Sequence, residues 1–225
     1  MKKILLVAAT ENEIAPLLKS FNKPDKKNPF HSYRKKNIQC DALITGAGMV
    51  NTVFMLSLVL SPEKYDLVLN AGIAGSFRKE IAIGDVVNVL EEIFSDFGAE
   101  DGENFLSAFE INLLEKNQFP FRDGKLKSEI SLPQFSKLKS VRGITVNTVH
   151  GNNKNISAVV KKFNPDIESM EGAAVAYCAM QFGIPWVEIR SISNRIERRD
   201  KSKWNIPLSI KNLNDELKNF IESIK

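Results

Sequence analysis

The chain begins with Ile4-Leu5-Leu6-Val7-Ala8-Ala9-Thr10-Glu11-Asn12-Glu13-Ile14, an apolar run that leads directly into a polar, acidic turn. Dense Ile, Leu and Val residues without polar alternation predict a strand that is covered on both faces. Apolar residues then recur at spacings of three and four over residues 13–21, which predicts a helix. A buried strand that runs straight into a helix is typical of α/β domains.

The same alternation continues along the chain. Further apolar runs predict strands at 42–45, 67–71, 85–89, 140–146 and 186–192, and periodic patterns predict helices at 50–60, 172–182 and 212–224. We expect one three-layer α/β/α domain with a mixed central sheet, covering residues 1–225. The polar stretch 23–36 predicts a loop that leads into an edge strand. The irregular stretch 94–139 predicts an insertion that forms a lid or an interface.

Composition excludes several classes of function. The 31 Lys and Arg residues exceed the 27 Asp and Glu residues by four, an excess too small to indicate nucleic-acid binding. Two Cys (Cys40 and Cys178) and two His (His31 and His150) are far apart in sequence, so no zinc-type spacing exists, and we expect no metal and no cofactor. The first apolar run is too short for a signal peptide, and no stretch approaches the ~18 apolar residues of a membrane span. We therefore expect a cytoplasmic protein without a membrane partner.

Glycine-rich turns follow two of the predicted strands. They are Thr45-Gly46-Ala47-Gly48 and Asn70-Ala71-Gly72-Ile73-Ala74-Gly75-Ser76. Neither matches the dinucleotide-binding or phosphate-binding glycine motifs. Tight turns explain them as well as close approach to a ligand does.

Acidic and amide side chains occupy other predicted strand ends. Glu13 is either a helix-capping acid or an acid that points into the crevice at the carboxyl ends of the strands. Glu171, before the Ala-rich helix, is costly to bury unless it is hydrogen-bonded, although a first-turn acid is the simpler interpretation. Asn194 ends the last strand and precedes a loop with Arg195, Arg198 and Arg199, most of whose charges we expect to be solvated.

The order of these segments resembles the nucleoside phosphorylase and nucleosidase superfamily over nearly the whole chain. The matching segments are Glu13, Thr45-Gly46-Ala47-Gly48, Asn70-Ala71-Gly72-Ile73-Ala74-Gly75, Ile83-Gly84-Asp85-Val86-Val87, Met170-Glu171-Gly172-Ala173-Ala174 and Arg190-Ser191-Ile192-Ser193-Asn194. Within it, the chain is similar to the methylthioadenosine/S-adenosylhomocysteine nucleosidases and most similar to the futalosine hydrolases of menaquinone biosynthesis. The segments 193–200 and 204–208 favour the latter.

The resemblance implies hydrolysis of the bond between a purine and ribose, through an oxocarbenium-like transition state. Glu13 matches the carboxylate that activates water, and Glu171 matches the residue that holds the ribose hydroxyls. Met170 matches the residue that lines the sugar. The glycine-rich turns, with Gly46, Gly72 and Ile73, are expected to approach the substrate. The resemblance also implies a homodimer or larger homo-oligomer.

Asn194 departs from the adenine-cleaving nucleosidases, which carry Asp here. An amide donates a hydrogen bond toward purine N7 and toward the O6 of a 6-oxopurine, so Asn194 favours hypoxanthine as the leaving base. This agrees with futalosine and weakens the methylthioadenosine alternative; aminodeoxyfutalosine is a further alternative substrate. The competing interpretation is that the Asn194 side chain only forms hydrogen bonds with the local backbone at the end of the strand.

Charge around the first turn favours water over phosphate as the nucleophile. Residues 8–14 contain two acidic residues and no basic residue. Arg78 could still bind an anion, so a purine nucleoside phosphorylase remains an alternative function. A non-catalytic nucleoside-binding protein with the same fold is a further alternative. The carboxylate of futalosine needs a cation, for which Arg195, Arg198 and Arg199 are candidates, with Trp204 against its ring.

Overall fold

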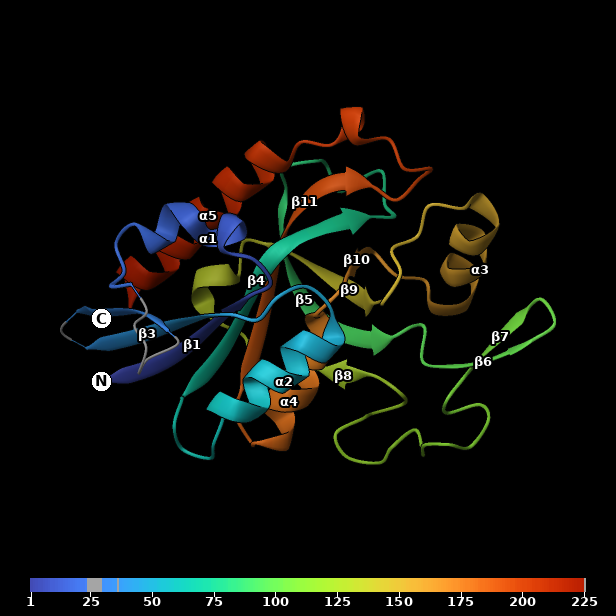
Figure 1. The fold of residues 1–225 in the computed structure, drawn as a ribbon, viewed down its shortest axis with the longest axis horizontal. Helices are drawn as coiled ribbons and strands as arrows, with labels where there is room; N and C mark the ends of the chain where they lie inside the picture. The colour runs from blue at the N-terminus through green and yellow to red at the C-terminus, as the bar shows by residue number, and fades with distance from the viewer. Residues whose placement is uncertain (24–29, 36, 225) are drawn as a thin grey trace.

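A nine-stranded mixed sheet organises the chain in a computed structural model that describes residues 1–23, 30–35 and 37–224. The strand order is β10-β9-β5-β11-β4-β1-β3-β2, with β8 beside β5 (Figure 1). The strands are β1 (Lys2–Ala8), β2 (His31–Lys35), β3 (Ile38–Ile44), β4 (Leu67–Ser76), β5 (Val86–Phe94), β8 (Leu126–Lys127), β9 (Lys139–Thr145), β10 (Ile167–Ser169) and β11 (Trp186–Arg195). A separate hairpin consists of β6 (Gly98–Asp101) and β7 (Asn104–Ser107).

Helices cover both faces of the sheet. They are α1 (Glu11–Leu18), α2 (Met49–Val59), α3 (Asn153–Phe163), α4 (Gly172–Gln181) and α5 (Ile206–Ser223). Figure 1 shows α1 and α5 together on one face and α2 and α4 together on the other. Two buried apolar clusters correspond to these layers, one containing Leu213 and Leu217 of α5 and the other Ala173 and Ala176 of α4. The predicted mixed α/β fold is confirmed.

Strand direction brings the glycine-rich turns to one edge of the sheet. Strands β1, β3, β4 and β11 are parallel, so their carboxyl ends lie together. Strand β10 pairs with both β9 and β4, so that β10, β9, β5, β11 and β4 form a closed ring. Residues from the beginning, middle and end of the chain therefore meet at one edge.

Several predicted boundaries differ from the structure. Helix α5 begins at Ile206 rather than at 212, because Asn205 accepts a hydrogen bond from Leu208 N (3.1 Å) and Pro207 is tolerated in a first turn. The stretch 23–36 was predicted to be a loop that leads into an edge strand, but the edge strand β2 (31–35) lies within it; residues 24–29 and 36 of this stretch lie outside the described ones. Strands β6, β7 and β8 lie within the irregular 94–139 stretch.

Helix α3 was not predicted from the sequence. Asn152 caps it by accepting hydrogen bonds from Lys154 N and Asn155 N. Its apolar face consists of Ile156, Val159, Val160 and Phe163, of which Val159 is buried and the others are half-buried. Over the described ranges, no helix is both long and apolar enough to span a bilayer.

Candidate active site

Glu13 lies in the first turn of α1 and has hydrogen-bond donors on both carboxylate oxygens. Its Oε2 accepts from Thr10 N (2.8 Å) and Thr10 Oγ1 (3.0 Å), which is the capping role expected of an acid at this position. Its Oε1 accepts from Ile73 N on β4 at 3.0 Å. The side chain is buried, with 7% exposed. Capping therefore fixes the Glu13 carboxylate against the glycine-rich segment 70–76, which was predicted to be a turn but belongs to strand β4.

Glu171 precedes α4 and joins the first glycine-rich turn to the same region. Its Oε1 accepts from Gly48 N at 2.9 Å, and its Oε2 lies 3.6 Å from Arg190 Nη1. Burial raises the pKa of Glu171; Arg190 and the Gly48 amide oppose this shift, and the charge of Glu13 adds to it. The hydrogen bond from Gly48 N therefore offsets part of the cost of burying the Glu171 carboxylate.

Arg190 is the buried cation between these two carboxylates, with 1% of its surface exposed. Its Nε donates to Glu188 Oε1 at 2.7 Å. A Cβ on Gly72 would lie 2.3 Å from Arg190 Nη1 and 2.8 Å from Glu13 Oε1, so only glycine leaves room for both groups. Burial disfavours the charged guanidinium, but the anions Glu188, Glu171 and Glu13 outweigh it and raise the pKa of Arg190.

Arg190 and Glu188 were assigned no role from the sequence alone, although the sequence contains a pattern that indicates a buried ion pair. Two charged residues at alternate positions of an otherwise apolar strand point to the same face. Buried charges persist when they are paired, so a Glu-x-Arg pattern in such a strand predicts a buried ion pair.

Asn194 makes only local hydrogen bonds. Its Nδ2 donates to Arg195 O (2.9 Å), and its Oδ1 accepts from Ser193 Oγ (2.8 Å). The competing interpretation of Asn194 therefore describes this structure. Its contact with a leaving base stays a prediction.

His150 and Glu168 form a second polar pair that the sequence did not assign. Glu168 is 2% exposed; its Oε1 accepts from His150 N at 2.9 Å, and its Oε2 contacts His150 Nδ1. Glu168 lies opposite Gly75 in the register of β10 and β4, and Asn194 lies beside Gly75 in that of β11 and β4. Glu168 and Asn194 therefore lie on either side of Gly75, on the two strands that flank this part of β4.

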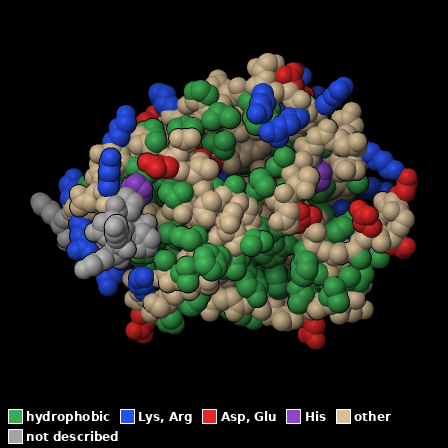
Figure 2. Space-filling view, in the orientation of Figure 1, with side chains coloured by type: hydrophobic (Ala, Val, Ile, Leu, Met, Phe, Trp, Pro, Cys, Tyr) green, Lys and Arg blue, Asp and Glu red, His purple; other side chains and the backbone are tan. Residues whose placement is uncertain are grey.

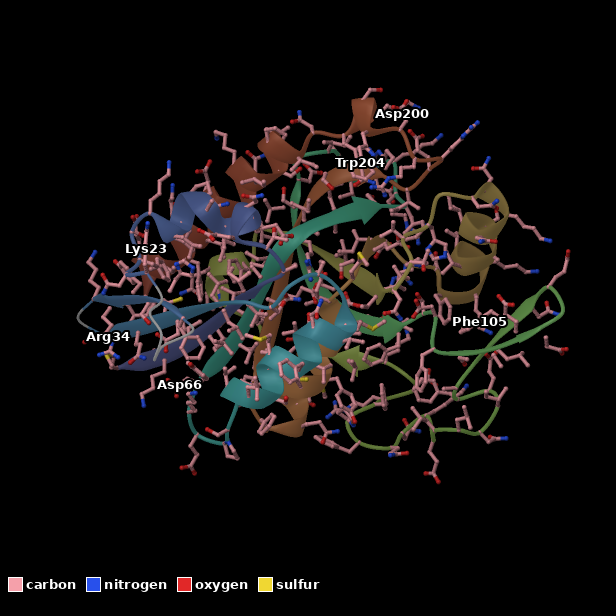
Figure 3. The ribbon with its side chains drawn as sticks, viewed as in Figure 1. Lys23, Arg34, Asp66, Phe105, Asp200 and Trp204 are labelled. Atoms are coloured by element: carbon pink, nitrogen blue, oxygen red, sulfur yellow. The ribbon has the colours of Figure 1, made fainter. Side chains whose placement is uncertain are left out.

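The cations of the loop after β11 differ in their partners. Arg195 donates to the carbonyls of Arg78, Lys79 and Ile81, so it fastens the loop to the turn after β4. The Arg199 guanidinium lies 4.8 Å from the ring centre of Trp204, which Figure 3 shows beside the end of β11. Arg198 is exposed.

Arg78 is engaged by an anion of the protein itself. Its Nε lies 2.8 Å from Asp166 Oδ1, and its Nη2 donates to Asn164 O at 3.1 Å. An arginine paired in this way is poorly placed to hold a phosphate nucleophile.

The structure brings most of the predicted residues to one place. Gly72, Ile73, Glu13 and Glu171 lie together, with Met170 half-buried next to Glu171 in the chain. Gly46 adopts a positive φ of 85° and donates from its N to Ala9 O, beside the start of α1. Figure 2 shows a hollow in the upper middle of the molecule, below a group of Lys and Arg side chains.

A separate cavity of about 470 Å³ lies at the opposite edge of the sheet, where Trp186 begins β11, and it belongs to a different region. In the described part of the chain, no three His, Cys, Asp or Glu side chains are grouped so as to hold a metal ion.

Known proteins resemble the chain over most of its length. A futalosine hydrolase of Thermus thermophilus is 30% identical over 165 residues, 72% of each chain, and a 5'-methylthioadenosine/S-adenosylhomocysteine nucleosidase of Maridesulfovibrio salexigens is 28% identical over 89% of each. The solved futalosine hydrolase mutant of Helicobacter pylori strain 26695 has a TM-score of 0.82 at 23% identity over both whole chains, which shows the shared fold. These relatives support an N-glycosyl hydrolase. The profile of the Phosphorylase superfamily matches residues 3–224, and the chain belongs to that family.

Proposed function

We propose that this protein hydrolyses the N-glycosidic bond of futalosine and releases hypoxanthine and dehypoxanthine futalosine, as a step of menaquinone biosynthesis. One observation carries the proposal of nucleoside hydrolysis: two buried carboxylates, Glu13 and Glu171, are held by separate backbone amides on either side of one buried arginine. The arrangement offers two anionic acceptors at fixed positions at the carboxyl edge of the sheet.

Each carboxylate suits one task of the reaction. Glu13, with Thr10 and Ile73 fixing its oxygens, acts as the general base that orients and deprotonates water. Glu171 accepts hydrogen bonds from the ribose hydroxyls, which strengthen as the sugar becomes cationic. Asn194 turns from its local bond and donates to the purine as negative charge develops on the base.

The nucleophile in this proposal is water. Arg190 is the buried cation nearest to Glu13, and Glu188 and Glu171 already balance its charge. Arg78 is paired with Asp166. Two anions at the site repel phosphate, so a phosphorylase is disfavoured.

The non-purine end of the substrate favours futalosine among purine nucleosides. Its carboxylate pairs with Arg198 or Arg199, which belong to the same loop as Trp204, and its ring packs against an aromatic side chain. Three relatives are named futalosine hydrolase, which agrees with this choice. Others are named nucleosidases for methylthioadenosine and S-adenosylhomocysteine, and these substrates remain the alternative along with aminodeoxyfutalosine.

The deciding experiment incubates the protein with futalosine, inosine and methylthioadenosine, with and without phosphate, and measures the released base. We expect hypoxanthine from futalosine at a rate that does not depend on phosphate. Faster release of adenine from methylthioadenosine would replace futalosine by the alternative substrate. Binding of hypoxanthine without any turnover would indicate a non-catalytic nucleoside-binding protein.

Base preference provides a prediction for Asn194. In Asn194→Asp, the side chain no longer donates to N7 and O6 without being protonated, so we expect the ratio of kcat/KM for futalosine over methylthioadenosine to fall about tenfold. The matched control is Asn219→Asp, at an exposed position of α5. An unchanged ratio would leave Asn194 with only its local bond.

The assembly proposed is a homodimer or larger homo-oligomer. Helix α2 exposes an apolar face made of Val50 (79%), Val53 (42%), Phe54 (61%) and Leu58 (65%). Figure 2 shows hydrophobic side chains gathered over the lower part of this view, where α2 lies in Figure 1. Exposed contiguous apolar surface of this kind marks interaction sites.

We predict that Leu58→Glu shifts the protein toward the monomer, because a carboxylate in an apolar interface is costly. Size-exclusion chromatography with light scattering measures the mass. Lys64→Glu is unsuitable as a control because Lys64 caps the α2 carbonyl Val59 O; Glu63→Lys, at an exposed position beyond the helix, is suitable. A wild-type monomer at all concentrations would refute the assembly.

The remaining expectations belong to the same proposal. The chain acts as one nucleosidase domain over residues 1–225, because a single nine-stranded sheet supports the backbone segments that hold both site carboxylates. A cytoplasmic location fits Cys40 and Cys178, which are buried and unpaired.

A further inference from the structure

A second pair of carboxyl groups lies beneath the candidate site. Glu92 on β5 and Glu188 on β11 are both 0% exposed. A Cβ on Gly172 would lie 2.4 Å from Glu92 Oε1 and 2.7 Å from Glu188 Oε1, so both oxygens border the same small space. Gly143 also leaves room for Glu92, since its Cβ would lie 2.1 Å from the same oxygen. Two glycines thus create the space in which the acids meet.

The hydrogen bonds of this pair are incomplete if both acids are ionised. Glu92 Oε2 accepts from Thr145 Oγ1 (2.8 Å), and Glu188 Oε1 accepts from Arg190 Nε (2.7 Å). Glu92 Oε1 and Glu188 Oε2 have no partner among the described residues. Buried polar atoms are normally paired, so two unpaired acceptors in adjacent acids indicate a missing proton.

We propose that Glu92 is protonated and donates a hydrogen bond to Glu188, and that Glu188 stays an anion and fixes Arg190 between Glu13 and Glu171. The proton belongs on Glu92 Oε1, since Oε2 already accepts from Thr145 and Glu188 already faces the guanidinium. Glu92 and Glu188 act through Arg190 and are positioning residues. The roles of Glu13 and Glu171 in this inference rest on the proposed function.

The surroundings of Glu92 favour its neutral form. Burial raises the pKa of Glu92 well above its ordinary range, the charge of Glu188 adds to this shift, and the Thr145 hydroxyl and Arg190 oppose it. The groups that face it are Glu188 and Arg190 from β11, Thr145 from β9, Gly172 at the start of α4, and apolar Leu126 from β8. One protonated acid, one anion and one cation make the buried set neutral, which lowers the cost of burying it.

The consequence for the site is geometric and electrostatic. Arg190 has its Nε held by Glu188, so its Nη1 is directed at Glu171 and at the space beside Gly72 and Glu13. If Glu188 were neutral, the guanidinium would lose this anchor and its ion pair with the site carboxylates would change.

Thermal unfolding tests the proton independently of catalysis. A group whose pKa is higher in the folded than in the unfolded state stabilises the folded protein at pH values below its unfolded pKa. That stabilisation is lost as the pH rises through the pKa of the folded state. Wild type should therefore lose stability relative to Glu92→Gln as pH rises from 5 to 8, and the Tm difference should grow by about 2–4 °C or more. Contributions of Glu171 cancel in this difference. A Tm difference that does not vary with pH would overturn the protonated Glu92.

Glu188→Gln tests the positioning role. We expect kcat for nucleoside cleavage to fall about tenfold or more, with a displaced acid limb in its pH profile, and Tm to fall as well because the buried Arg190 loses its anionic partner. Glu222→Gln, at an exposed position on α5, should retain both the rate and the limb. A Glu188→Gln enzyme with an unchanged rate and pH profile would overturn the positioning role and leave the proposed function intact. If wild type cleaves no nucleoside, the proposed function fails, and the pH dependence of Tm still decides the proton.

Discussion

Replacing Glu13 by Gln is expected to lower kcat for futalosine cleavage by about 10²–10⁴-fold while hypoxanthine still binds. The amide has nearly the same shape as the carboxylate but cannot take a proton from water. Steady-state base release measures turnover, and a thermal shift with hypoxanthine measures binding. Turnover within a few-fold of wild type would remove Glu13 from the role of general base.

The same substitution also lowers the stability of the folded protein modestly, and this loss must be separated from the loss of catalytic rate. Glu13 accepts from Thr10 N and from Ile73 N on different oxygens, and a Gln amide meets one of these donors with its own NH₂ group. Loss of one capping bond costs about 1 kcal/mol. Glu11→Gln is the matched control, because Glu11 lies in the same turn but is exposed. The control should keep both rate and Tm.

The fold could be predicted from the sequence because the central strands are dense in Ile, Val and Leu. Strands β1 and β11 are buried along most of their length, and their apolar runs contain few competing signals. Helix α3 was missed although its sequence carries the signal, because Ile156, Val159, Val160 and Phe163 recur at spacings of three and four among polar residues. Strands β6 to β8 are two to four residues long, too short for a period of two to be distinguished from chance.

The candidate site was only partly predictable for a different reason. Glu13 and Glu171 follow strands whose order marks the superfamily, so the resemblance assigned their roles. The Glu188–Arg190 pair could be read from its spacing within β11, but the approach of Glu92 to it depends on contacts between β11, β5 and the start of α4, and these depend on sheet order. The Glu168–His150 pair likewise requires β10 to pair with β9, the strand that precedes His150. Such long-range pairings are not encoded in local spacing.

At Gly72 the sequence and the structure each indicate a role for the glycine. Its substitution is expected to have the second large effect that we predict. The sequence suggested that this glycine approaches the substrate, whereas the structure shows that its missing side chain makes room for Arg190 Nη1 and Glu13 Oε1. Its backbone does not need a positive φ, so Ala is compatible with the chain conformation. The effect of Gly72→Ala therefore arises from space alone.

Gly72→Ala forces the buried guanidinium and the carboxylate apart, because its Cβ would lie 2.3 Å from one and 2.8 Å from the other. Overpacking of this kind costs about 1–3 kcal/mol, and displacement of a catalytic group by about 1 Å costs about 10²-fold in rate. We expect both losses, measured by Tm and by kcat for futalosine. Gly151→Ala is the matched control, since its Cβ would meet its nearest atoms at ordinary distances of 3.8 and 3.9 Å. A Gly72→Ala enzyme with normal kcat would mean that Arg190 and Glu13 need not be held together for turnover.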